Sequence, residues 1–342
     1  MAAKRATIKD IAREAGVSPA TVSRALSDHS SISKATRLKI AEIARQLNYR
    51  PNLQAKSLRT HATKTIALIL PEINSFFVPE MMYGINTAAA ELGFSVMMFQ
   101  SDNQLAREKE LLWYATELSA DGILLSLSEE TESLEHVQQL RDSGTPLLLI
   151  DKTGGTTDIP SLTIDGAAAA ADAVRHLLDK GHRQIGGVFG HPALSITQNR
   201  RSGYLRALDA AGLSETDCPT LEVSQILEIS TNLHRFLNDY PGLTALFLMS
   251  DELMVHTHHE LSALGIRIPE QLSLIAISDG IAPYYLHPNI THLHHSGYGM
   301  GYEAARMLIT HITQRPTPAN PAPLQGAILP TKRCELHSVR QI

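Results

Sequence analysis

The feature that most constrains the fold is an alternation of short apolar runs with longer amphipathic stretches, which begins near residue 65 and starts again near residue 161. This alternation is typical of a parallel β-sheet with helices on both faces. In the first series we expect strands at Thr65–Leu70, Phe94–Phe99, Gly122–Leu127 and Pro146–Asp151, with helices near 78–91, 104–118 and 132–143. In the second we expect strands at Ser161–Ile164, Gln184–Phe189, Thr244–Met249 and Leu272–Ile277, with helices near 166–180, 198–211, 226–239 and 252–264. Two such α/β halves in tandem predict a bilobed body.

The composition limits the class of protein. The chain has 342 residues, of which 43% are hydrophobic and 19% charged, so it can bury a large core. No apolar run approaches the length of about 18 residues that a membrane-spanning helix needs. The segment Met1–Asp10 lacks the apolar core of a secretion signal, and Cys218 and Cys334 are too few for a disulfide framework. We therefore expect a cytoplasmic protein of two or three domains that makes no membrane contact.

Charge is distributed unevenly along the chain. Residues 1–60 contain 12 Lys and Arg against 4 Asp and Glu, a net charge of +8. The remaining residues contain 18 basic and 31 acidic side chains, a net charge of −13. A basic head on an acidic body suggests that the head binds a polyanion. The alternative is a solvated basic face without a partner.

The basic head has the pattern of three short helices. Thr7 can cap a first helix that ends at Gly16, and Ser18 followed by Pro19 can start a second helix after a very short turn. Two helices joined in this way form a helix-turn-helix. Ser33 can cap a third helix. The side chains expected to form the small core are Ile8, Ile11, Ala12, Ala15, Val22, Ala25, Leu26, Ile40, Ile43, Ala44 and Leu47.

The outward face of the second helix carries Ala20, Thr21, Ser23 and Arg24. Small residues let a helix approach a partner closely, hydroxyls can donate to phosphates or bases, and an arginine can bind the edge of a guanine. Such a face is unusual for a solvated surface and suits the major groove of DNA. Three-helix units also occur in proteins that do not bind DNA, so the prediction depends on the positive charge as well.

Residues 49–64 are expected to form a hinge. Pro51 ends the third helix, and Asn52 can cap a helix of six residues, Leu53–Leu58. A helix this short is not stable alone in water, so we expect it to form when it packs against the same segment of a second subunit on DNA. Leu58 would then be a dimer contact or a wedge in the minor groove. The alternative is an ordinary linker.

Several motifs resemble the lactose/galactose repressor family of bacterial transcription factors. In the head they are TIKDIAREAGVS at 7–18, TVSRAL at 21–26 and NYRPN at 48–52. In the body they are GHRQI at 181–185, RRSGY at 200–204 and IPEQLSLI at 268–275. The resemblance implies a homodimer, or a dimer of dimers, on a pseudo-palindromic operator in double-stranded DNA. It also implies that the second helix reads the major groove and that paired hinge helices kink the minor groove through a leucine.

The resemblance assigns DNA contacts position by position. Pro19, Ala20 and Arg24 would contact bases. Leu58 would be the minor-groove wedge, with Ala55 beside it. The residues that would contact phosphate or sugar are Thr7, Ser18, Thr21, Ser23, Ser33 and Asn52.

The head departs from the family pattern in two respects. Ser27 stands where the family usually has Asn or His, and Pro19-Ala20 offers no hydrogen-bonding side chain. We therefore expect few direct base contacts besides that of Arg24, and a larger role for DNA deformability.

Polar side chains follow the ends of the expected strands in the body. They are Glu72, Asn74, Asp151, Ser250, Asp251, Ser278 and Asp279, and Arg200 is expected to open a helix after the loop 191–199. Ligands of such sheets bind beyond the carboxyl ends of the strands, so the cleft between the lobes is the expected binding site. Carboxylates and a guanidinium there could hold the hydroxyls of a sugar. For Asp251 and Asp279 the alternative is helix capping.

The family resemblance implies effector contacts for Phe77, Asp151, Arg200, Asp251, Asp279 and His295. The positions of Arg200 and Asp279 contact the effector in relatives, Phe76-Phe77 resembles an aromatic pair of the pocket, and relatives often have Gln at the position of His295. The run Ile277–Gly280 departs from the family pattern, so the identity of the effector is not transferred. We expect a sugar or a sugar phosphate, with a purine or nucleoside as the alternative.

Other classes of protein fit the sequence less well. Two clusters have metal-like spacing: His256, His258 and His259, and His292, His294 and His295. Neither has an acidic or cysteine ligand at the usual spacing, so we expect no metal and no cofactor. There is no G-x-S-x-G, Walker A or H-E-x-x-H motif, so we expect no enzyme. A periplasmic sugar-binding protein would share the bilobed body but not the basic head.

The predicted organisation joins an all-α helix-turn-helix head to an α/β body. The head is expected at 1–48, the hinge helix and linker at 49–64, and the body at 65–342, with two doubly wound parallel-sheet lobes like those of periplasmic binding proteins. The lobes are expected at about 65–160 plus 293–320 and about 161–292 plus 321–342, with a basic strand-like piece at Ile328–Arg333. The predicted function is a DNA-binding repressor whose operator affinity is controlled by a small effector in the cleft.

Overall fold

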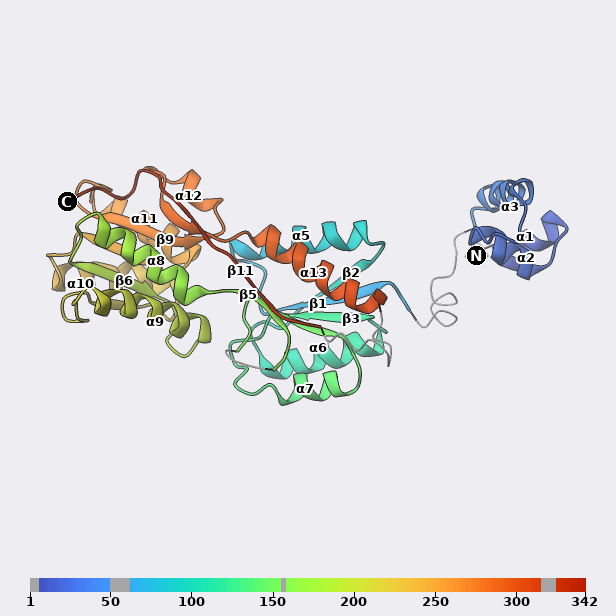
Figure 1. Ribbon diagram of the computed structural model, residues 1–342, viewed down its shortest axis with the longest axis horizontal. Helices are drawn as coiled ribbons and strands as arrows, with labels where there is room; N and C mark the ends of the chain where they lie inside the picture. The colour runs from blue at the N-terminus through green and yellow to red at the C-terminus, as the bar shows by residue number, and fades with distance from the viewer. Residues whose placement is uncertain (1–5, 50–61, 155–157, 315–323) are drawn as a thin grey trace. The chain divides into compact units, whose positions relative to one another are not determined.

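The computed structural model describes residues 6–49, 62–154, 158–314 and 324–342. The hinge residues Asn52, Ala55 and Leu58 lie outside these ranges. The chain forms two compact units, residues 1–63 and 64–342. Figure 1 shows that the first unit is helical and that the second contains two β-sheets flanked by helices.

Three short helices form the amino-terminal unit: α1 (Ile8–Ala15), α2 (Pro19–Leu26) and α3 (Lys34–Gln46). Each follows a predicted cap, because the side chains of Thr7, Ser18 and Ser33 accept a hydrogen bond from the first turn of their own helices. Gly16 ends α1 at φ 69°, a left-handed conformation that favours glycine. The three predicted helices before residue 48 and the turn of the helix-turn-helix are confirmed.

The core of this unit is smaller than the sequence pattern indicated. Ile11, Val22 and Ile40 are fully buried at its centre. The prediction that Leu26 and Leu47 pack inside is wrong, because their side chains are 38% and 37% exposed. Leu26 is the last residue of α2 and Leu47 directly follows α3, so both lie at helix ends.

The first sheet of the body has the strand order β11-β5-β4-β3-β1-β2, and all its strand pairs are parallel. Its strands are β1 (Thr65–Leu70), β2 (Ser95–Gln100), β3 (Gly122–Leu125), β4 (Leu147–Ile150), β5 (Ser161–Ile164) and β11 (Ala327–Leu329). Its helices are α5 (Phe77–Glu91), α6 (Leu105–Glu117), α7 (Glu135–Asp142) and α13 (Gly297–Gln314). Ile66 and Leu68 pack with α5 and α13, whereas Ala67 and Ile69 pack with α6 and α7. Both faces are covered, which explains the continuous apolar run of β1.

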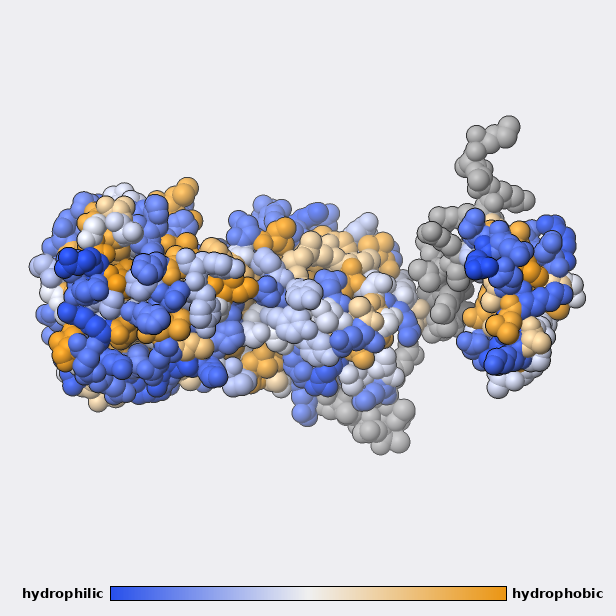
Figure 2. Space-filling view, turned by 90° about the horizontal axis from the view of Figure 1, so that it is seen from above, coloured by the Kyte–Doolittle hydropathy of each residue, from blue (hydrophilic) through white to orange (hydrophobic). Residues whose placement is uncertain are grey.

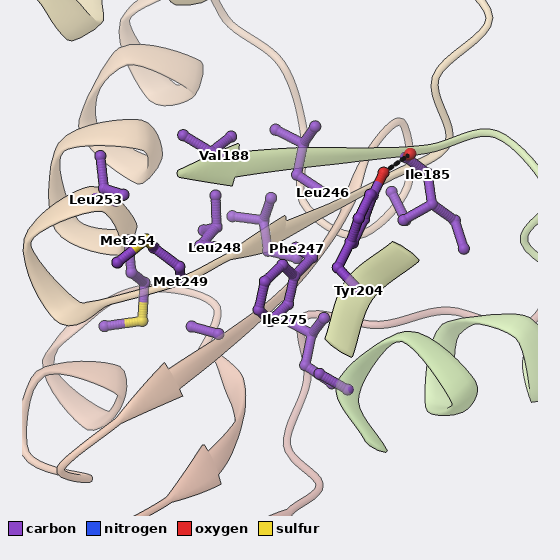
Figure 3. Close-up of a cluster of buried hydrophobic side chains, with 14 of the residues drawn as sticks. Ile185, Val188, Tyr204, Leu246, Phe247, Leu248, Met249, Leu253, Met254 and Ile275 are labelled. Atoms are coloured by element: carbon purple, nitrogen blue, oxygen red, sulfur yellow. Dashed lines mark hydrogen bonds between the residues drawn. The ribbon is translucent and has the colours of Figure 1, made fainter. Parts of the chain in front are cut away.

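The second sheet has the strand order β12-β10-β9-β8-β6-β7 and is parallel except for the antiparallel pair β10–β12. Its strands are β6 (Ile185–Phe189), β7 (Thr220–Glu222), β8 (Ala245–Leu248), β9 (Ser273–Ser278), β10 (Thr291–His294) and β12 (Lys332–Cys334). Its helices are α8 (Gly166–Asp179), α9 (Ser195–Ala210), η1 (Ile226–Glu228), α10 (Ile229–Asp239), α11 (Asp251–Ala263) and α12 (Ala282–Tyr285). In its core, shown in Figure 3, Tyr204 Oη donates to the carbonyl oxygen of Ile185 at 2.7 Å. This bond ties α9 to β6.

The chain crosses between the lobes three times, and the crossovers lie at other residues than the predicted lobe boundaries. β5 belongs to the first sheet and β10 to the second, so the first two crossovers follow residues 164 and 294 rather than 160 and 292. The third lies between β11 and β12. The prediction of one strand-like piece at Ile328–Arg333 is therefore wrong, because β11 pairs with β5 and β12 pairs with β10. Pro330 lies between them and has no N–H to continue a ladder.

The other predicted strands and helices of the body form within three residues of their expected bounds. α9 begins at Ser195, three residues earlier than predicted, which places Arg200 inside the helix rather than at its start. The short strand β7, the single-turn helix α12 and the helix α13 were not predicted. The face of the molecule in Figure 2 is mainly hydrophilic, with hydrophobic residues in small groups. No helix among the described residues is long and apolar enough to cross a membrane.

Candidate functional site

The outer face of α2 is the first candidate site. Pro19, Ala20 and Arg24 are exposed, and Thr21 and Ser23 are half-buried. Three other arginines of this unit are held in ion pairs: Arg13 with Asp10, Arg37 with Asp28 and Arg45 with Glu42. Within the described part of the head, no ion pair or hydrogen bond engages the guanidinium of Arg24. Arg24 is therefore available to a partner.

Three of the predicted phosphate contacts, Thr7, Ser18 and Ser33, are N-caps, and the last two make the same kind of contacts. Ser18 Oγ accepts a hydrogen bond from the Thr21 backbone N–H at 3.1 Å and lies 2.9 Å from Thr21 Oγ1. Ser33 makes the same pair of contacts with Thr36, at 3.2 and 2.8 Å. The N-terminus of a helix carries a partial positive charge that favours anions. The exposed starts of α2 and α3 thus combine hydroxyls with positive helix ends.

The hydroxyls of Thr7 and Ser27 donate instead to a carboxylate and to backbone carbonyl oxygens. Thr7 donates its hydroxyl to Asp10 Oδ2 at 2.7 Å, which places a carboxylate at the start of α1. Ser27 donates to the carbonyl oxygens of Ser23 and Arg24 at 3.0 and 3.2 Å, so its hydroxyl is turned toward the end of α2. These contacts make Thr7 and Ser27 poorer partners for DNA than Ser18 and Ser33.

A cavity of about 190 Å³ between the two lobes is the second candidate site. It is lined by residues that follow β1, β3, β4 and β8, where a parallel sheet places its ligands. Five of the six predicted effector contacts line it: Phe77, Asp151, Arg200, Asp251 and His295. Asp279 does not line it.

Arg200 is 5% exposed and lies in the second turn of α9. Its Nη1 donates to the carbonyl oxygen of Met249, whereas its Nε has no hydrogen-bond partner among the described residues. Burial lowers the pKa of the guanidinium, and the charges of Asp151, Asp251 and Glu252 act in the opposite direction. Arg200 thus offers an unused N–H donor in a cavity whose carboxylates balance its charge.

Asp251 is the first residue of α11, but it does not cap the helix. The cap is Ser250, whose Oγ accepts from the Leu253 N–H at 3.4 Å. The carboxylate of Asp251 instead accepts from the Ser278 hydroxyl and from the Asp279 backbone N–H at 3.1 Å. Burial raises the pKa of Asp251 to about 7, so protonated and ionised forms coexist near neutral pH.

Asp279 has a local structural role at the end of β9. Its Oδ1 accepts from the Ile281 N–H at 3.1 Å, just before α12, and its backbone N–H binds Asp251. Its Oδ2 is buried and has no partner within the described ranges, and burial raises the pKa of the carboxyl. The carboxylate turns back to the start of α12, which explains why it does not line the cavity.

The cavity also contains a carboxyl group, an imidazole and an aromatic ring, from Asp151, His295 and Phe77. Asp151 follows β4 at φ 58°, and burial raises the pKa of its carboxyl. His295 is 7% exposed, and its ring Nδ1 has no partner among the residues described. Burial lowers its pKa to about 3, so the imidazole is neutral and offers one donor and one acceptor. Its ring centroid lies 5.0 Å from that of Phe77. The set suits a small ring that carries several hydroxyls.

The sequence-based reasoning missed other polar residues of the cavity. Ser126, Lys152 and Glu252 line it, as does Glu72, one of the carboxylates expected at the strand ends. Lys152 Nζ lies 3.7 Å from Glu72 Oε1 and 3.4 Å from Glu129 Oε1. Ser126 directly follows β3, so a stricter use of the strand-end rule would have found it.

The histidine clusters form no metal centre in the described part of the chain, where no group of three or more His, Cys, Asp or Glu side chains could hold a metal ion. His258 Nε2 instead contacts the carbonyl oxygen of His287 at 3.0 Å. His292 is buried, with Nδ1 2.8 Å from the carbonyl oxygen of Ile290.

The chain joins a helix-turn-helix head to a bilobed body with a polar cavity between its lobes. This is the architecture of transcription regulators that have a ligand-binding domain. Residues 7–52 match the family described as bacterial regulatory proteins, lacI family, and residues 174–329 match the periplasmic binding protein-like domain. The chain is 32% identical over 310 residues to catabolite control protein A of Priestia megaterium, which covers 90% of this chain and 93% of that protein. The chain therefore belongs to the LacI family of bacterial regulatory proteins, as its motifs predicted.

Solved structures support the same architecture. The complex of the transcriptional regulator CelR with cellobiose is 26% identical, with a TM-score of 0.69 and coverage of 98% of this chain and 100% of that chain. The Lac repressor dimer bound to operator and an anti-inducer has a TM-score of 0.86 at 18% identity, with coverage of 98% and 100%, and shows the fold. The predicted fold class is confirmed. These similar proteins are transcription regulators rather than enzymes.

Proposed function

We propose that this protein is a cytoplasmic transcriptional repressor that binds a pseudo-palindromic operator as a homodimer and responds to a small effector in the interlobe cavity. Membership of the LacI family supports DNA binding. The cellobiose complex of the similar regulator CelR supports an effector that is a sugar or a sugar phosphate.

The observation that carries the proposal is the set of polar groups around the cavity that are left for a ligand. Arg200 Nε and His295 Nδ1 are buried without a partner among the described residues, and Asp151 lies beside them. A buried donor or acceptor without a partner costs about 1–3 kcal/mol. A sugar hydroxyl both donates and accepts, so a polyhydroxylated ring can satisfy a guanidinium, an imidazole and a carboxylate together.

On DNA, α2 would occupy the major groove, with Arg24 on a guanine edge. The starts of α2 and α3 at Ser18 and Ser33 would contact phosphates, since their hydroxyls and helix ends are exposed. The hinge, with Asn52 near phosphate or sugar and Leu58 in the minor groove, completes the interface. Binding should weaken steeply with salt, because phosphate contacts by Lys and Arg release counterions.

Control of DNA binding would arise from a shift between two arrangements of the lobes. The cavity contains groups from both lobes, so an effector that binds them favours one interlobe angle over the other. In a dimer this angle sets the separation of the two hinge segments, which pair or separate. The effector can influence DNA only by the difference in its affinity for the two arrangements.

The test is an anisotropy titration of full-length protein with operator DNA selected from the host genome, in the presence and absence of a host metabolite extract. We expect tight binding of the selected DNA, weak binding of random DNA, and an affinity for the selected DNA that changes with the extract. Equal affinity for selected and random DNA would contradict the proposal.

A further inference from the structure

Glu252 is a cavity residue that joins the two lobes. It is the second residue of α11 in the second lobe, and its Oε1 accepts a hydrogen bond from the backbone N–H of Phe76 in the first lobe at 3.2 Å. Phe76 directly precedes α5. Apart from the three crossovers, the bond from Phe76 to Glu252 is the one side-chain hydrogen bond between the lobes among the described residues. No ion pair joins the lobes within these residues. The bond thus joins the two lobes directly.

The start of α5 has a backbone N–H that no side chain of its own first turn binds, and Glu252 accepts a hydrogen bond from it. The side chain of Phe76 makes no capping hydrogen bond, and Ser75 Oγ serves the Val78 N–H at 3.2 Å. The first amides of a helix lack partners within the helix and carry partial positive charge. Glu252 lies in the first turn of α11 as well. One carboxylate therefore stabilises the positive ends of two helices, one from each lobe.

Glu252 is also part of the electrostatic environment of the cavity. It lines the cavity together with Asp151, Asp251 and Arg200. Its charge helps to raise the pKa of both aspartates and opposes the lowering of the arginine pKa. A ligand that binds Arg200 or these carboxylates alters the field at Glu252, and hence the strength of its bond to Phe76.

The position of α5 is transmitted to a crossover. A Cβ on Gly84 would lie 2.1 Å from the carbonyl oxygen of Tyr298, and a Cβ on Gly301 would lie 1.9 Å from that of Met81. The two glycines therefore let the backbones of α5 and α13 touch, and the helices should move together. The crossover that follows β10 contains His295, and α13 begins directly after it. A shift of α5 relative to α11 thus acts on the connection between the lobes.

We propose that Glu252 is an interlobe latch, whose carboxylate holds the start of α5 against α11 and whose release or tightening couples the occupied cavity to the lobe arrangement. The coupling to an occupied cavity rests on the proposed function, whereas the latch itself does not. Glu252 acts by positioning the two helices.

The test of the latch uses full-length protein without ligand. Hydrogen exchange is measured for the variants Glu252→Ala and Glu252→Gln, with Glu270→Gln as a matched control, because Glu270 is exposed and does not line the interlobe cavity. We expect amides at the start of α5 to exchange about tenfold to a hundredfold faster in the Ala variant, the scale of losing a hydrogen bond to a charged group. The Gln variant keeps an acceptor without the charge and should lie between. The control should match the unmodified protein.

Small-angle scattering of the same variants reports the lobe arrangement directly. The Ala variant should shift to a more open average shape, while the Gln variant, nearly identical in size, controls for lost packing. Unchanged exchange at the start of α5 together with unchanged scattering in the Ala variant would overturn the latch.

An operator titration with the host metabolite extract separates the latch from the proposed function. In the Glu252 variants, the amount of extract that gives half of the response should change about fivefold or more. If the unmodified protein shows no response while the variants exchange faster, the effector proposal fails and the latch stands. If the unmodified protein responds while exchange and response are unaltered in the variants, the latch fails and the effector proposal stands.

Discussion

The head and the interlobe cavity differ in the exposure and the hydrogen bonding of their polar side chains. In the head, the hydroxyls of Ser18 and Ser33 are bonded within their own helices, and Arg24 is exposed to solvent. In the cavity, Arg200 and His295 are buried, and each has a nitrogen without a partner among the described residues. Among the described residues, the polar side chains of the head considered above are thus bonded within the head or exposed to water, whereas the cavity contains buried nitrogens that lack a partner, which is unfavourable. Under the proposed function, a ligand that satisfies these nitrogens stabilises one arrangement of the lobes.

The largest effect is expected at Arg200, on the cavity side of the comparison. Arg200→Ala should weaken effector binding by about 2–5 kcal/mol, because it removes one member of a buried set of hydrogen-bonded charges. The DNA affinity without effector should stay unchanged. Operator titration with the metabolite extract measures both quantities. Arg201→Ala is the control, since Arg201 forms a surface ion pair with Glu215. A normal effector response in Arg200→Ala would refute the assignment.

The pH dependence of stability should depend on Asp251. Its pKa is about 7 in the folded protein against 3.8 as the ordinary value, so the folded state binds more protons between about pH 4 and 7. The free energy of unfolding should therefore fall as pH rises through this window, by a few kcal/mol at most. His295 acts in the opposite direction, because its pKa is lowered to about 3.

Asp251→Asn isolates the contribution of the aspartate. The variant should lose stability at acidic pH and show a flatter decline toward neutral pH, since only the aspartate contribution is removed. Urea unfolding at several pH values measures the slope. Parallel pH curves for the two proteins would show that Asp251 ionises normally in the folded state.

On the head side, Arg24→Ala should weaken binding to the selected operator by about 1–3 kcal/mol and change binding to random DNA little, because a guanine contact carries sequence information. Anisotropy titrations with both DNAs measure the two affinities. Arg13→Ala is a matched control, since Arg13 is paired with Asp10. Equal losses on both DNAs would assign Arg24 to the phosphate backbone instead.

The smallest effect is expected at Ser18. Ser18→Ala removes the N-cap of α2 and should destabilise the helix by about 1 kcal/mol. It should also weaken the binding of selected and of random DNA to a similar extent, because a phosphate contact is insensitive to sequence. Ser30→Ala, at an exposed position between α2 and α3, is the control. A loss confined to the selected DNA would mean that Ser18 reads a base.

The head was more predictable than the cavity because its signals are local. Thr7, Gly16, Ser18 and Ser33 act on residues within three or four positions, so the sequence pattern alone located three helices and their turn. The exposure of Leu26 was missed because it depends on where neighbouring helices end.

The cavity was predicted in outline, since the ends of parallel strands meet at one edge of each sheet. Its details depend on contacts between distant residues. The bond from Glu252 to Phe76 spans 176 positions, and the bond from the Asp279 N–H to the Asp251 carboxylate spans 28. The same limit applies to β5, whose membership of the first sheet is decided by its pairing with β4 and β11.

The central claim is that one chain reads DNA under the control of an effector in the interlobe cavity. The most direct measurement is genome-wide footprinting of the purified protein on fragmented host DNA at two salt concentrations, with and without the metabolite extract, for the unmodified protein and Arg200→Ala. We predict a palindromic motif whose occupancy falls at high salt and changes with the extract only in the unmodified protein. The absence of an enriched site under every condition would contradict the account.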